Sequence, residues 1–290
     1  MCGIFGGHEL LLKNFPEEIL NHRGPDQFGK LQIKLENQEP IIIGNTRLSI
    51  VDRDPINLPV RDNDWIISFN GEIYNWKDIK KKLESEGHKF ITNTDTEVVL
   101  KALKFWGENA LNLFNGMFAI ALWDGTNLKL IRDRVGIKPI FYIHNKNRFA
   151  FSSEIKVFKD LDFMPVEICN IMEFYFDEYT PYSNIKSIKP GEILTWNSKY
   201  NSIKTMKWWS FPDYDGSIVD EKYAVDEFIN IFTSACNIRK IADVPVTVFQ
   251  SGGIDSSLIQ AVVKSEDTFT VEFKEYEDQI VESIYTKEMS

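Results

Sequence analysis

The chain begins Met1-Cys2-Gly3-Ile4-Phe5-Gly6, a cysteine followed by a short apolar run that favours a buried strand. If Met1 is removed, the thiol and the free α-amine of the chain belong to one residue. A thiol acts as a nucleophile near neutral pH only when a base accepts its proton or its pKa is lowered. An α-amine, whose ordinary pKa is about 7.7–8.0, is such a base without any histidine. The pattern predicts a nucleophilic cysteine at the start of the first strand.

Beyond this strand, the first half of the chain consists of many short β-forming runs and a few helical ones. Strands are expected at residues 2–6, 31–35, 41–45, 65–70, 117–123, 128–133 and 149–152. Helices are expected at 76–86 and 95–106, because apolar residues recur there at helical spacing and a glycine follows. Such strand clusters flanked by helices indicate an α+β arrangement, with layers of sheet covered by helices.

The pattern changes after about Asp177. Residues 180–215 carry several Pro, Ser and Asn together with aromatic residues, which indicates the edge of a first domain and a connector. A helical run, a β-branched run, a Gly-rich loop, a second helical run and a strand-like run follow, at 223–239, 244–249, 251–253, 254–264 and 268–273. This order is typical of a parallel sheet with helices on its faces. Only the opening of such a domain is present, so we expect a C-terminally truncated chain that ends in a helix at 280–290.

Composition excludes several classes of protein. The formal net charge of −10 argues against broad binding to nucleic acid or to anionic membranes. No apolar run approaches the roughly 20 residues that span a bilayer, and no secretory signal is visible. The three cysteines, Cys2, Cys169 and Cys236, lack the spacing of a zinc site or a disulfide framework. A cytoplasmic, reducing location fits this usage.

Three polar features of the first half have no evident packing role. Arg47 stands alone in a strand-like run, and its guanidinium suits bidentate capture of a carboxylate, although a surface ion pair is the simpler reading. Asn70-Gly71 ends a strand and forms either a hairpin turn or an oxyanion hole made of an amide and a backbone N–H. Asp95 either caps the following helix or binds a substrate ammonium.

The run Ser251-Gly252-Gly253-Ile254-Asp255-Ser256-Ser257 follows a β-branched strand and opens a helix. Its glycines allow close approach of the backbone, and the helix N-terminus favours an anion. No lysine follows, so the run is not a Walker A loop. An ordinary turn is the alternative to a phosphate-binding loop.

In this order, several segments resemble the glutaminase domain of asparagine synthetases, which are N-terminal-nucleophile (class II) glutamine amidotransferases. The segments are residues 2–4, 22–26, 46–52, 69–75, 94–97, 115–119, 132–139 and 151–156. The resemblance implies a four-layer αββα glutaminase domain over 2–183 and a connector over 184–222. It also implies that 223–290 are the incomplete N-terminal part of an α/β ATP-pyrophosphatase domain, similar to the adenine nucleotide α-hydrolases.

The resemblance also implies roles for matching positions. Cys2 is the nucleophile, and its own α-amine accepts the proton, so His22 is structural. Asn70 and Gly71 stabilise the oxyanion. The side chains that bind the glutamine carboxylate and ammonium are Arg47 and Asp95. The main chain of Leu48, Ile50 and Val51 and the side chain of Glu72 complete the pocket.

The second part of the chain resembles the nucleotide-binding region of ATP pyrophosphatases. The resemblance implies that the β,γ-phosphates are held by Ser251, Gly252, Gly253, Ser256 and Ser257. Asp255 binds Mg²⁺, and Phe249 and Val271 contribute to the nucleotide site, Val271 through its backbone to adenine. One departure is Phe249-Gln250, since the family usually has an apolar leucine before the loop.

These implications describe a glutamine-dependent asparagine synthetase that uses ATP and Mg²⁺. Cys2 would hydrolyse glutamine to glutamate and ammonia, and ammonia would amidate aspartate activated as β-aspartyl-AMP. Two alternatives stay open: an amidotransferase for another carboxylate acceptor, and a truncated regulatory or subunit-binding protein without catalysis. Glutamine, aspartate and ATP are the expected partners, without nucleic acid or membrane, and a homodimer is the assembly considered. This chain alone is expected to have glutaminase but no synthetase activity.

Overall fold

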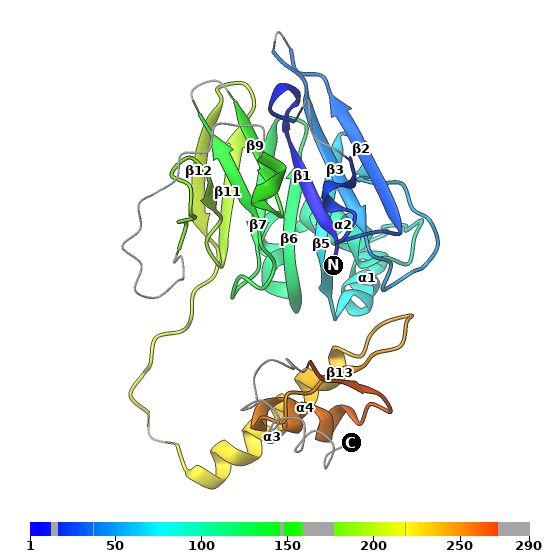
Figure 1. Cartoon of the computed structure of the whole chain (residues 1–290), viewed down its shortest axis with the longest axis vertical. Coiled ribbons are helices and arrows are strands. Elements are labelled where there is room, and N and C mark those ends of the chain that lie inside the picture. The colour runs from blue at the N-terminus through cyan, green and yellow to red at the C-terminus, as the bar shows by residue number, and fades with distance from the viewer. Residues whose placement is uncertain (13–16, 37, 146–147, 159–176, 218, 272–290) are drawn as a thin grey trace. The chain divides into compact units, whose positions relative to one another are not determined.

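The structure is a computed structural model of the chain and describes residues 1–12, 17–36, 38–145, 148–158, 177–217 and 219–271. The chain divides into two compact units, Met1–Pro212 and Asp213–Ser290 (Figure 1). Cys169 and the helix expected at 280–290 lie outside the described residues. Each unit is considered by itself below.

Two six-stranded sheets form the first unit, and every pairing within them is antiparallel. The first sheet has the order β10-β8-β9-β1-β3-β2, with strands at Lys186–Ser187, Phe141–His144, Phe149–Ser152, Gly3–His8, Ile41–Arg47 and Gln27–Ile33. The second sheet has the order β12-β11-β7-β6-β5-β4, with strands at Ser202–Lys207, Glu192–Asn197, Asn127–Arg132, Gly116–Trp123, Trp65–Ile73 and Val60–Asp62.

Alternation along β6 explains how the second sheet packs on both faces. Phe118, Ile120 and Leu122 join a buried cluster with α1 (Trp76–Ser85), α2 (Asp95–Trp106) and the 3-10 segment η3 (Gly107–Leu113). Ala119 and Ala121, one residue out of step, face the first sheet. Because successive side chains of a strand point to opposite faces, one strand serves both layers. Small alanines between the sheets allow close packing.

The outer face of the first sheet carries a separate buried cluster that includes Phe5 and Ala150. Three 3-10 segments contribute to this layer: η1 (Glu9–Leu11), η2 (Glu17–Leu20) and η4 (Ile155–Phe158). Two stacked antiparallel sheets between helical layers confirm the expected α+β glutaminase-type fold. The core therefore has three parts, one between the sheets and one on each outer face.

Polar side chains connect the two sheets near the start of β1. Asn45 is 2% exposed, and its Nδ2 donates to the Gly3 carbonyl at 2.9 Å and to the Phe69 carbonyl at 3.4 Å. The Phe69 N–H donates back to Asn45 Oδ1 at 3.2 Å. Beside it, Ser68 Oγ donates to the Gly44 carbonyl at 2.7 Å. These contacts fix β1 and β3 of the first sheet against β5 of the second.

The second unit contains α3 (Glu221–Ile238), β13 (Val248–Phe249), α4 (Ile254–Val263) and β14 (Thr268–Phe269). The strands β13 and β14 pair in parallel, with α4 between them in sequence. This confirms the predicted strand–helix–strand order, although both strands are shorter than the patterns at 244–249 and 268–273. None of the helices in the described residues is long and apolar enough to cross a membrane.

Part of the predicted connector, 184–222, instead belongs to the sheets. Strands β10, β11 and β12 lie within 186–207, and β11 pairs with β7 and β12. Its side chains Ile193, Leu194 and Trp196 are at most 1% exposed, so the segment contributes to the core rather than linking domains. Pro190 and Asn201, which suggested a connector, lie in the turns before and after β11. The expected strand at 31–35 also differs, because β2 spans Gln27–Ile33.

Replacement of Asn45 by alanine should lower the free energy of unfolding of the first unit by about 1–3 kcal/mol, because it leaves buried backbone groups without partners. All seven tryptophans lie within Met1–Pro212, so tryptophan fluorescence during urea unfolding reports this unit. Gln38→Ala, which removes one exposed amide bond to the Lys199 carbonyl, is the control and should change little. Equal midpoints for N45A and the parent would contradict the bridging role.

Candidate active site

Cys2 directly precedes β1, and its side chain contacts the loop that follows β3. The Leu48 N–H donates to Sγ at 3.5 Å, and Sγ lies 3.8 Å from the Leu48 carbonyl. On the main-chain side, Arg23 Nε donates to the Cys2 carbonyl at 2.9 Å. In the structure Met1 precedes Cys2, so the free amine belongs to Met1. Pairing of β1 with β3 at Gly3 and Thr46 brings the thiol to this loop.

A cleft next to Cys2 brings together residues from β3, the loop that follows it, β5 and the start of α2. Among its lining residues are Cys2, Arg47, Leu48, Ile50, Val51, Gly71, Glu72 and Asp95. These are all of the residues expected to bind glutamine except Asn70, which precedes Gly71 on β5. The cavity volume is about 30 Å³, enough for a few water molecules. The cleft is closed in this conformation.

The guanidinium of Arg47 is already hydrogen-bonded within the protein. Its Nη1 donates to Gln27 Oε1 at 2.8 Å and to the Asp54 carbonyl at 2.9 Å. Its Nη2 donates to the Val51 carbonyl at 3.1 Å and to the Asp52 carbonyl. Each terminal nitrogen has two protons, so all four are engaged. A carboxylate would therefore have to displace at least one of these acceptors to bind Arg47.

Asn70 is 1% exposed, and neither Nδ2 nor Oδ1 has a hydrogen-bond partner in the described residues. It pairs with Ala119 across β5 and β6, so its side chain lies on the face directed toward the first sheet. Buried side-chain amides are almost always hydrogen-bonded. An amide without partners at this position is the feature that a ligand oxygen would complete.

Two carboxyl groups share the cleft. Asp95 Oδ2 accepts from the Ile73 N–H at 3.0 Å, and burial raises the pKa of Asp95 to about 6. Burial, followed by the charge of Asp95, raises the pKa of Glu72 to about 8. Asp95 is not the helix cap: Thr94 is the N-cap, and its side chain accepts from the Glu97 N–H. The carboxyl of Asp95 is thus directed to the cleft.

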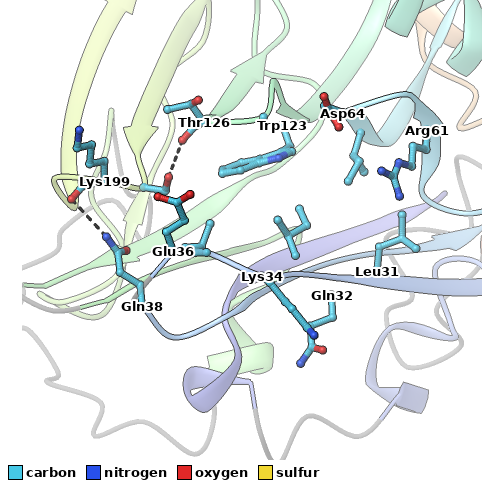
Figure 2. A pocket seen from close by; sticks show the side chains of 15 residues that line it. Leu31, Gln32, Lys34, Glu36, Gln38, Arg61, Asp64, Trp123, Thr126 and Lys199 are labelled. Carbon is cyan, nitrogen blue, oxygen red and sulfur yellow. Dashed lines mark hydrogen bonds between the residues drawn. The ribbon is translucent and has the colours of Figure 1, made fainter.

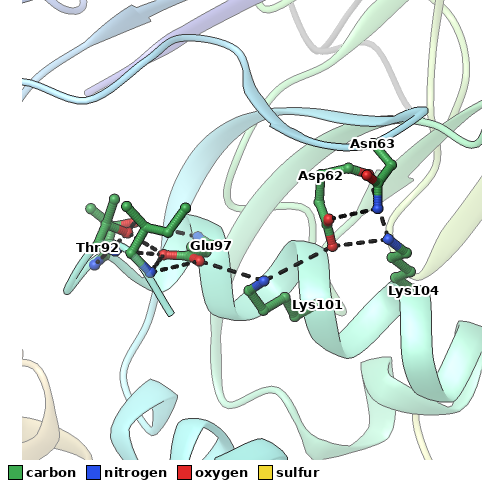
Figure 3. A network of polar contacts seen from close by, with 8 residues as sticks. Asp62, Asn63, Thr92, Glu97, Lys101 and Lys104 are labelled. Carbon is green, nitrogen blue, oxygen red and sulfur yellow. Dashed lines mark hydrogen bonds and ion pairs between the residues drawn. The ribbon is translucent and has the colours of Figure 1, made fainter. Parts of the chain in front are cut away.

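Glu97 and two lysines hold the start of α2 in place, as Figure 3 shows. The Glu97 carboxylate accepts the Ile91 N–H at 3.0 Å and the Thr92 N–H at 2.7 Å. Lys104 lies 2.9 Å from Asp62 Oδ2, which ties the same helix to β4. Lys101 lies 3.6 Å from Glu97 and joins the two groups. Asp95 therefore projects from a fixed helix end.

Burial shifts the pKa values of the thiol and of the terminal amine in opposite directions. Burial raises the pKa of the Cys2 thiol, while the Leu48 N–H and the nearby ammonium oppose this shift. Burial lowers the pKa of the terminal amine, here on Met1. Both shifts favour the neutral forms, a protonated thiol beside an unprotonated amine.

Two charged residues of the site were missed by the sequence reasoning, Arg23 and Lys138. Arg23 is 8% exposed, lies 2.9 Å from Glu154 and has a buried Nη2 without a partner in the described residues. Lys138 is 5% exposed and interacts electrostatically with Cys2 and Glu72. Both stand in segments that carry the resemblance, 22–26 and 132–139, which was the available signal.

His22 pairs with Glu154 at 2.8 Å, as Arg23 does at 2.9 Å. Burial alone would raise the pKa of Glu154, but hydrogen bonds from Lys156, Arg23 and His22 lower it to about 2. Glu154 is therefore ionised across the physiological range and orients Arg23 against the Cys2 carbonyl. In this arrangement His22 contributes to the support of Arg23.

A second, larger cavity of about 790 Å³ opens at the other end of the two sheets. Figure 2 shows Leu31, Arg61, Trp123 and Lys199 around it, from β2, β4, the end of β6 and the turn after β11. Strand register places it far from Cys2, because Ile33 pairs with Ile41 while Gly3 pairs with Thr46. The residues that line it include Thr126 and Ser198 but no cysteine or histidine.

The Gly-rich loop of the second unit forms the start of α4. Gly252 has a φ of 78°, which glycine adopts without strain. Ser256 Oγ lies 3.2 Å from Ser251 Oγ, and Ser257 Oγ donates to the Gly253 carbonyl at 2.7 Å. Asp255 stands in the first turn of the helix. Hydroxyls, a helix N-terminus and an adjacent carboxylate are a donor set that fits a phosphate with Mg²⁺.

The other residues expected at a nucleotide site lie close to this loop. Phe249 is 75% exposed and Val271 is 63% exposed, so both are accessible from solvent in the second unit. Gln250 is 2% exposed, and neither polar atom of its side chain has a partner in the described residues. The departure from leucine thus places a buried amide before the loop.

Comparison with known families decides what this arrangement is. Residues 1–209 match the family model for the glutamine amidotransferase domain. The chain belongs to the glutamine amidotransferase family. Residues 227–290 match the family model for asparagine synthase, so an amidotransferase domain is followed by the start of a synthase region. The resemblance inferred from the ordered segments is confirmed.

Curated relatives of this amidotransferase include two glutamine-hydrolysing asparagine synthetases of Bacillus subtilis, numbers 3 and 1. Synthetase 3 is 30% identical to this chain, and the match covers 90% of this chain and 45% of the relative. Synthetase 1 is 32% identical, and the match covers 95% of this chain and 46% of the relative. The chain therefore spans roughly half the length of these relatives. An amidase of Gibberella zeae is 31% identical, over 85% of this chain and 38% of the relative.

Solved structures support the fold. A glutamine phosphoribosylpyrophosphate amidotransferase of Bacillus subtilis superposes with a TM-score of 0.53 and 16% identity, covering 93% of this chain and 65% of the other. An allosteric regulatory enzyme of purine biosynthesis gives a TM-score of 0.54 at 16% identity, covering 95% and 66%. At this identity the likeness concerns the fold alone.

Glu72 should make the stability of this amidotransferase depend on pH. Its pKa is about 8 in the folded state and about 4.3 in an unfolded chain. Between these values the folded state binds more protons, so the free energy of unfolding falls as the pH rises. The variant Glu72→Gln has no carboxyl at this position, so its free energy of unfolding should not fall in this way as the pH rises. Its Tm should exceed that of the parent at pH 8.5 by about 2–4 °C, the shift caused by 1 kcal/mol.

Scanning calorimetry at pH 5 and pH 8.5 measures the difference, which should shrink at the lower pH. The matched control is Glu84→Gln, an exposed carboxylate on α1 that should leave the Tm unchanged at both values. If E72Q gave the same Tm difference from the parent at both pH values, the assignment of a raised pKa to Glu72 would be wrong.

Proposed function

We propose that the first unit hydrolyses glutamine to glutamate and ammonia with Cys2 as the nucleophile. The observation that carries the proposal is that Cys2 and Gly71 line one cleft and that Asn70, which precedes Gly71, is a buried amide without partners in the described residues. Arg47, Glu72 and Asp95 line the cleft beside them with the charges that a free α-amino acid requires. Membership of the glutamine amidotransferase family supports the same reaction.

The reaction begins once Met1 has been removed and the amine belongs to Cys2. The amine accepts the thiol proton, and the sulfur attacks the side-chain carbonyl carbon of glutamine. The oxyanion that forms accepts hydrogen bonds from Asn70 Nδ2 and the Gly71 N–H. The ammonium then gives its proton to the amide nitrogen, the C–N bond breaks, and ammonia leaves. Water hydrolyses the resulting γ-glutamyl thioester to glutamate and restores the thiol.

Binding of glutamine opens the cleft. The substrate carboxylate replaces backbone carbonyls of residues 51–54 on Arg47, while the ammonium pairs with Asp95. The main chain of Leu48, Ile50 and Val51 borders the same space. Because the empty cavity has only about 30 Å³, this loop has to move before glutamine enters. Closure of the loop over the bound substrate then excludes water during the first step.

The second unit is proposed to begin the site where ammonia is used. The loop at 251–257 would hold the phosphates of ATP, with Mg²⁺ on Asp255 and the nucleotide near Phe249 and Val271. A bound Mg²⁺ would neutralise negative charge on the departing pyrophosphate. Aspartate is the acceptor that the names of the relatives support. Because another relative is named an amidase, an amidotransferase that acts on a different carboxylate acceptor is the alternative. We place this chemistry in the cytoplasm and propose a homodimer.

Replacement of Cys2 by alanine should reduce glutamine hydrolysis to the background of the assay. Asn70→Ala should lower kcat by about 10²–10³ because it removes one donor to the oxyanion. Release of ammonia and glutamate, followed in a coupled assay with the full chain, measures both effects. Gln38→Ala serves again as an exposed amide control and should retain activity. Full turnover by C2A would refute the assignment of the nucleophile.

Asp255→Asn should remove the effect of Mg²⁺ on nucleotide binding. Titration calorimetry of the full chain with ATP should give tighter binding with Mg²⁺ than without it. The D255N variant should bind ATP equally in both conditions, because the carboxylate that holds the ion is gone. Asp267→Asn, an exposed aspartate in the same unit, is the control. A preserved Mg²⁺ effect in D255N would contradict the proposed metal position.

A further inference from the structure

The loop that follows β3, residues 48–56, borders the cleft and is held near both of its ends. The Ser49 N–H donates to Asp26 Oδ2 at 2.7 Å. Near the other end, the Ile56 N–H donates to Gln27 Oε1 at 3.2 Å, and Gln27 Nε2 donates to the Ile56 carbonyl at 3.2 Å. Gln27 is the first residue of β2, and Asp26 directly precedes it. Both ends of the loop are therefore fixed to the first sheet.

The middle of the loop is folded around Arg47 and Asp52. Arg47 donates to the carbonyls of Val51, Asp52 and Asp54. Asp52 has a φ of 54°, a left-handed conformation that aspartate adopts more readily than most residues. Its Oδ1 accepts the Asp54 N–H at 3.3 Å, which closes a turn within the loop. In this fold the loop places its own carbonyls on the guanidinium that the proposed substrate carboxylate would bind.

A second hydrogen bond of Asp52 reaches outside the loop. Asp52 Oδ2 accepts the Asn93 N–H at 2.9 Å, from a residue 41 positions away in the sequence. Asn93 is held in turn, because Lys80 Nζ on α1 donates to Asn93 Oδ1 at 3.0 Å. The next residue, Thr94, is the N-cap of α2. A turn within the loop needs no such distant partner, so this contact specifically joins the loop to the start of α2.

The hydrogen bond between Asp52 and Asn93 joins two parts of the cleft wall. Asp52 follows Val51 and Asn93 precedes Thr94, and both of these neighbours line the cavity. The loop wall carries the carbonyls that occupy the proposed carboxylate site, and the other wall leads into the helix that carries the proposed ammonium site. With the walls joined, the cavity has only about 30 Å³, far less than a free amino acid needs.

We propose that Asp52 is a positioning residue that latches the empty cleft, by joining the loop 48–56 to the start of α2 until glutamine enters. The proposal rests on the proposed function, which makes glutamine the molecule that fills the cleft. Asp52 touches neither substrate nor reacting atoms and acts through Arg47 and Asn93. To open the cleft, its carbonyl leaves Arg47 and its carboxylate leaves the Asn93 N–H. The substrate carboxylate replaces the first contact, whereas the loss of the second is not compensated.

A latch of this kind lowers the affinity for glutamine, because only the open fraction of the protein binds. Its removal should increase both the frequency of loop opening and the affinity. Loss of one hydrogen bond predicts a change of about three- to tenfold in each. A carboxylate that only stabilised the folded cleft would act in the opposite direction, since its loss would weaken binding. The sign of the change in affinity therefore separates a latch from a merely structural contact.

The variant Asp52→Gly removes the carboxylate, and glycine adopts the left-handed conformation without strain. Hydrogen exchange of the full chain without glutamine, resolved to single amides, measures loop opening. The Ser49 and Ile56 amides keep their own acceptors, so faster exchange there reports opening of the loop. We expect an increase of about three- to tenfold in D52G. Arg53→Gly is the matched control: it adds a glycine to the same loop by removing an exposed side chain, and should exchange as the parent does.

Glutamine binding is then measured by titration calorimetry in the C2A background, which prevents turnover. C2A/D52G should bind about three- to tenfold more tightly than C2A, and C2A/R53G should match C2A. Unchanged exchange in D52G, an equal increase in R53G, or equal or weaker binding by C2A/D52G would overturn the proposal. Absence of glutamine binding to C2A itself would contradict the proposed function instead. The exchange experiment contains no glutamine, so it decides on the latch in that case.

A measurement on the unsubstituted chain keeps the test decisive if D52G does not fold. The Asn93 N–H lies outside the loop and donates to the Asp52 carboxylate. If the latch and the loop open together, the amides of Ser49, Ile56 and Asn93 should exchange with one common free energy of opening. Exchange of Ser49 and Ile56 at a free energy different from that of Asn93 would show that the loop opens independently of this contact, and would overturn the proposal.

Discussion

The side chain of Asn45 is the contact on which the site depends. Its amide bonds Gly3, the residue after Cys2, and Phe69, the residue before Asn70. One buried group thus sets the separation of Cys2 and Asn70, which belong to different sheets. Hydrophobic packing between the sheets is not directional and would tolerate sliding. The hydrogen bonds of Asn45 give the interface a fixed register where the chemistry takes place.

Around this fixed point, burial shifts the pKa of several ionisable groups. It raises the pKa of the Cys2 thiol, of Glu72 and of Asp95, and it lowers the pKa of the terminal amine of Met1. Arg47 is hydrogen-bonded by carbonyls of its own loop. In the proposed reaction, a zwitterionic amino acid would bring one charge for Arg47 and one for Asp95.

Sequence patterns predicted the fold where the hydrophobic pattern of a single element matches the way that element packs in the layers. The apolar run of β6 and the helical spacing of α2 identified both elements, because β6 packs with both faces on a core and α2 with one face. Strand β11 was missed because the Pro and Asn residues in its turns resemble those of a linker. In the site, residue types identified Arg47 and Asp95. The hydrogen bonds of Arg47 to Gln27 and to carbonyls of residues 51–54 depend on how separate segments fold together, which no local pattern contains.

The most direct test of the nucleophile is covalent labelling with a glutamine analogue that carries a diazoketone in place of the side-chain amide. Intact mass and peptide mapping of the labelled protein would locate the adduct. A single adduct on Cys2 of a chain that lacks Met1, prevented by excess glutamine, is the predicted result. An adduct elsewhere, or a folded chain that keeps Met1 and still turns over glutamine, would contradict it.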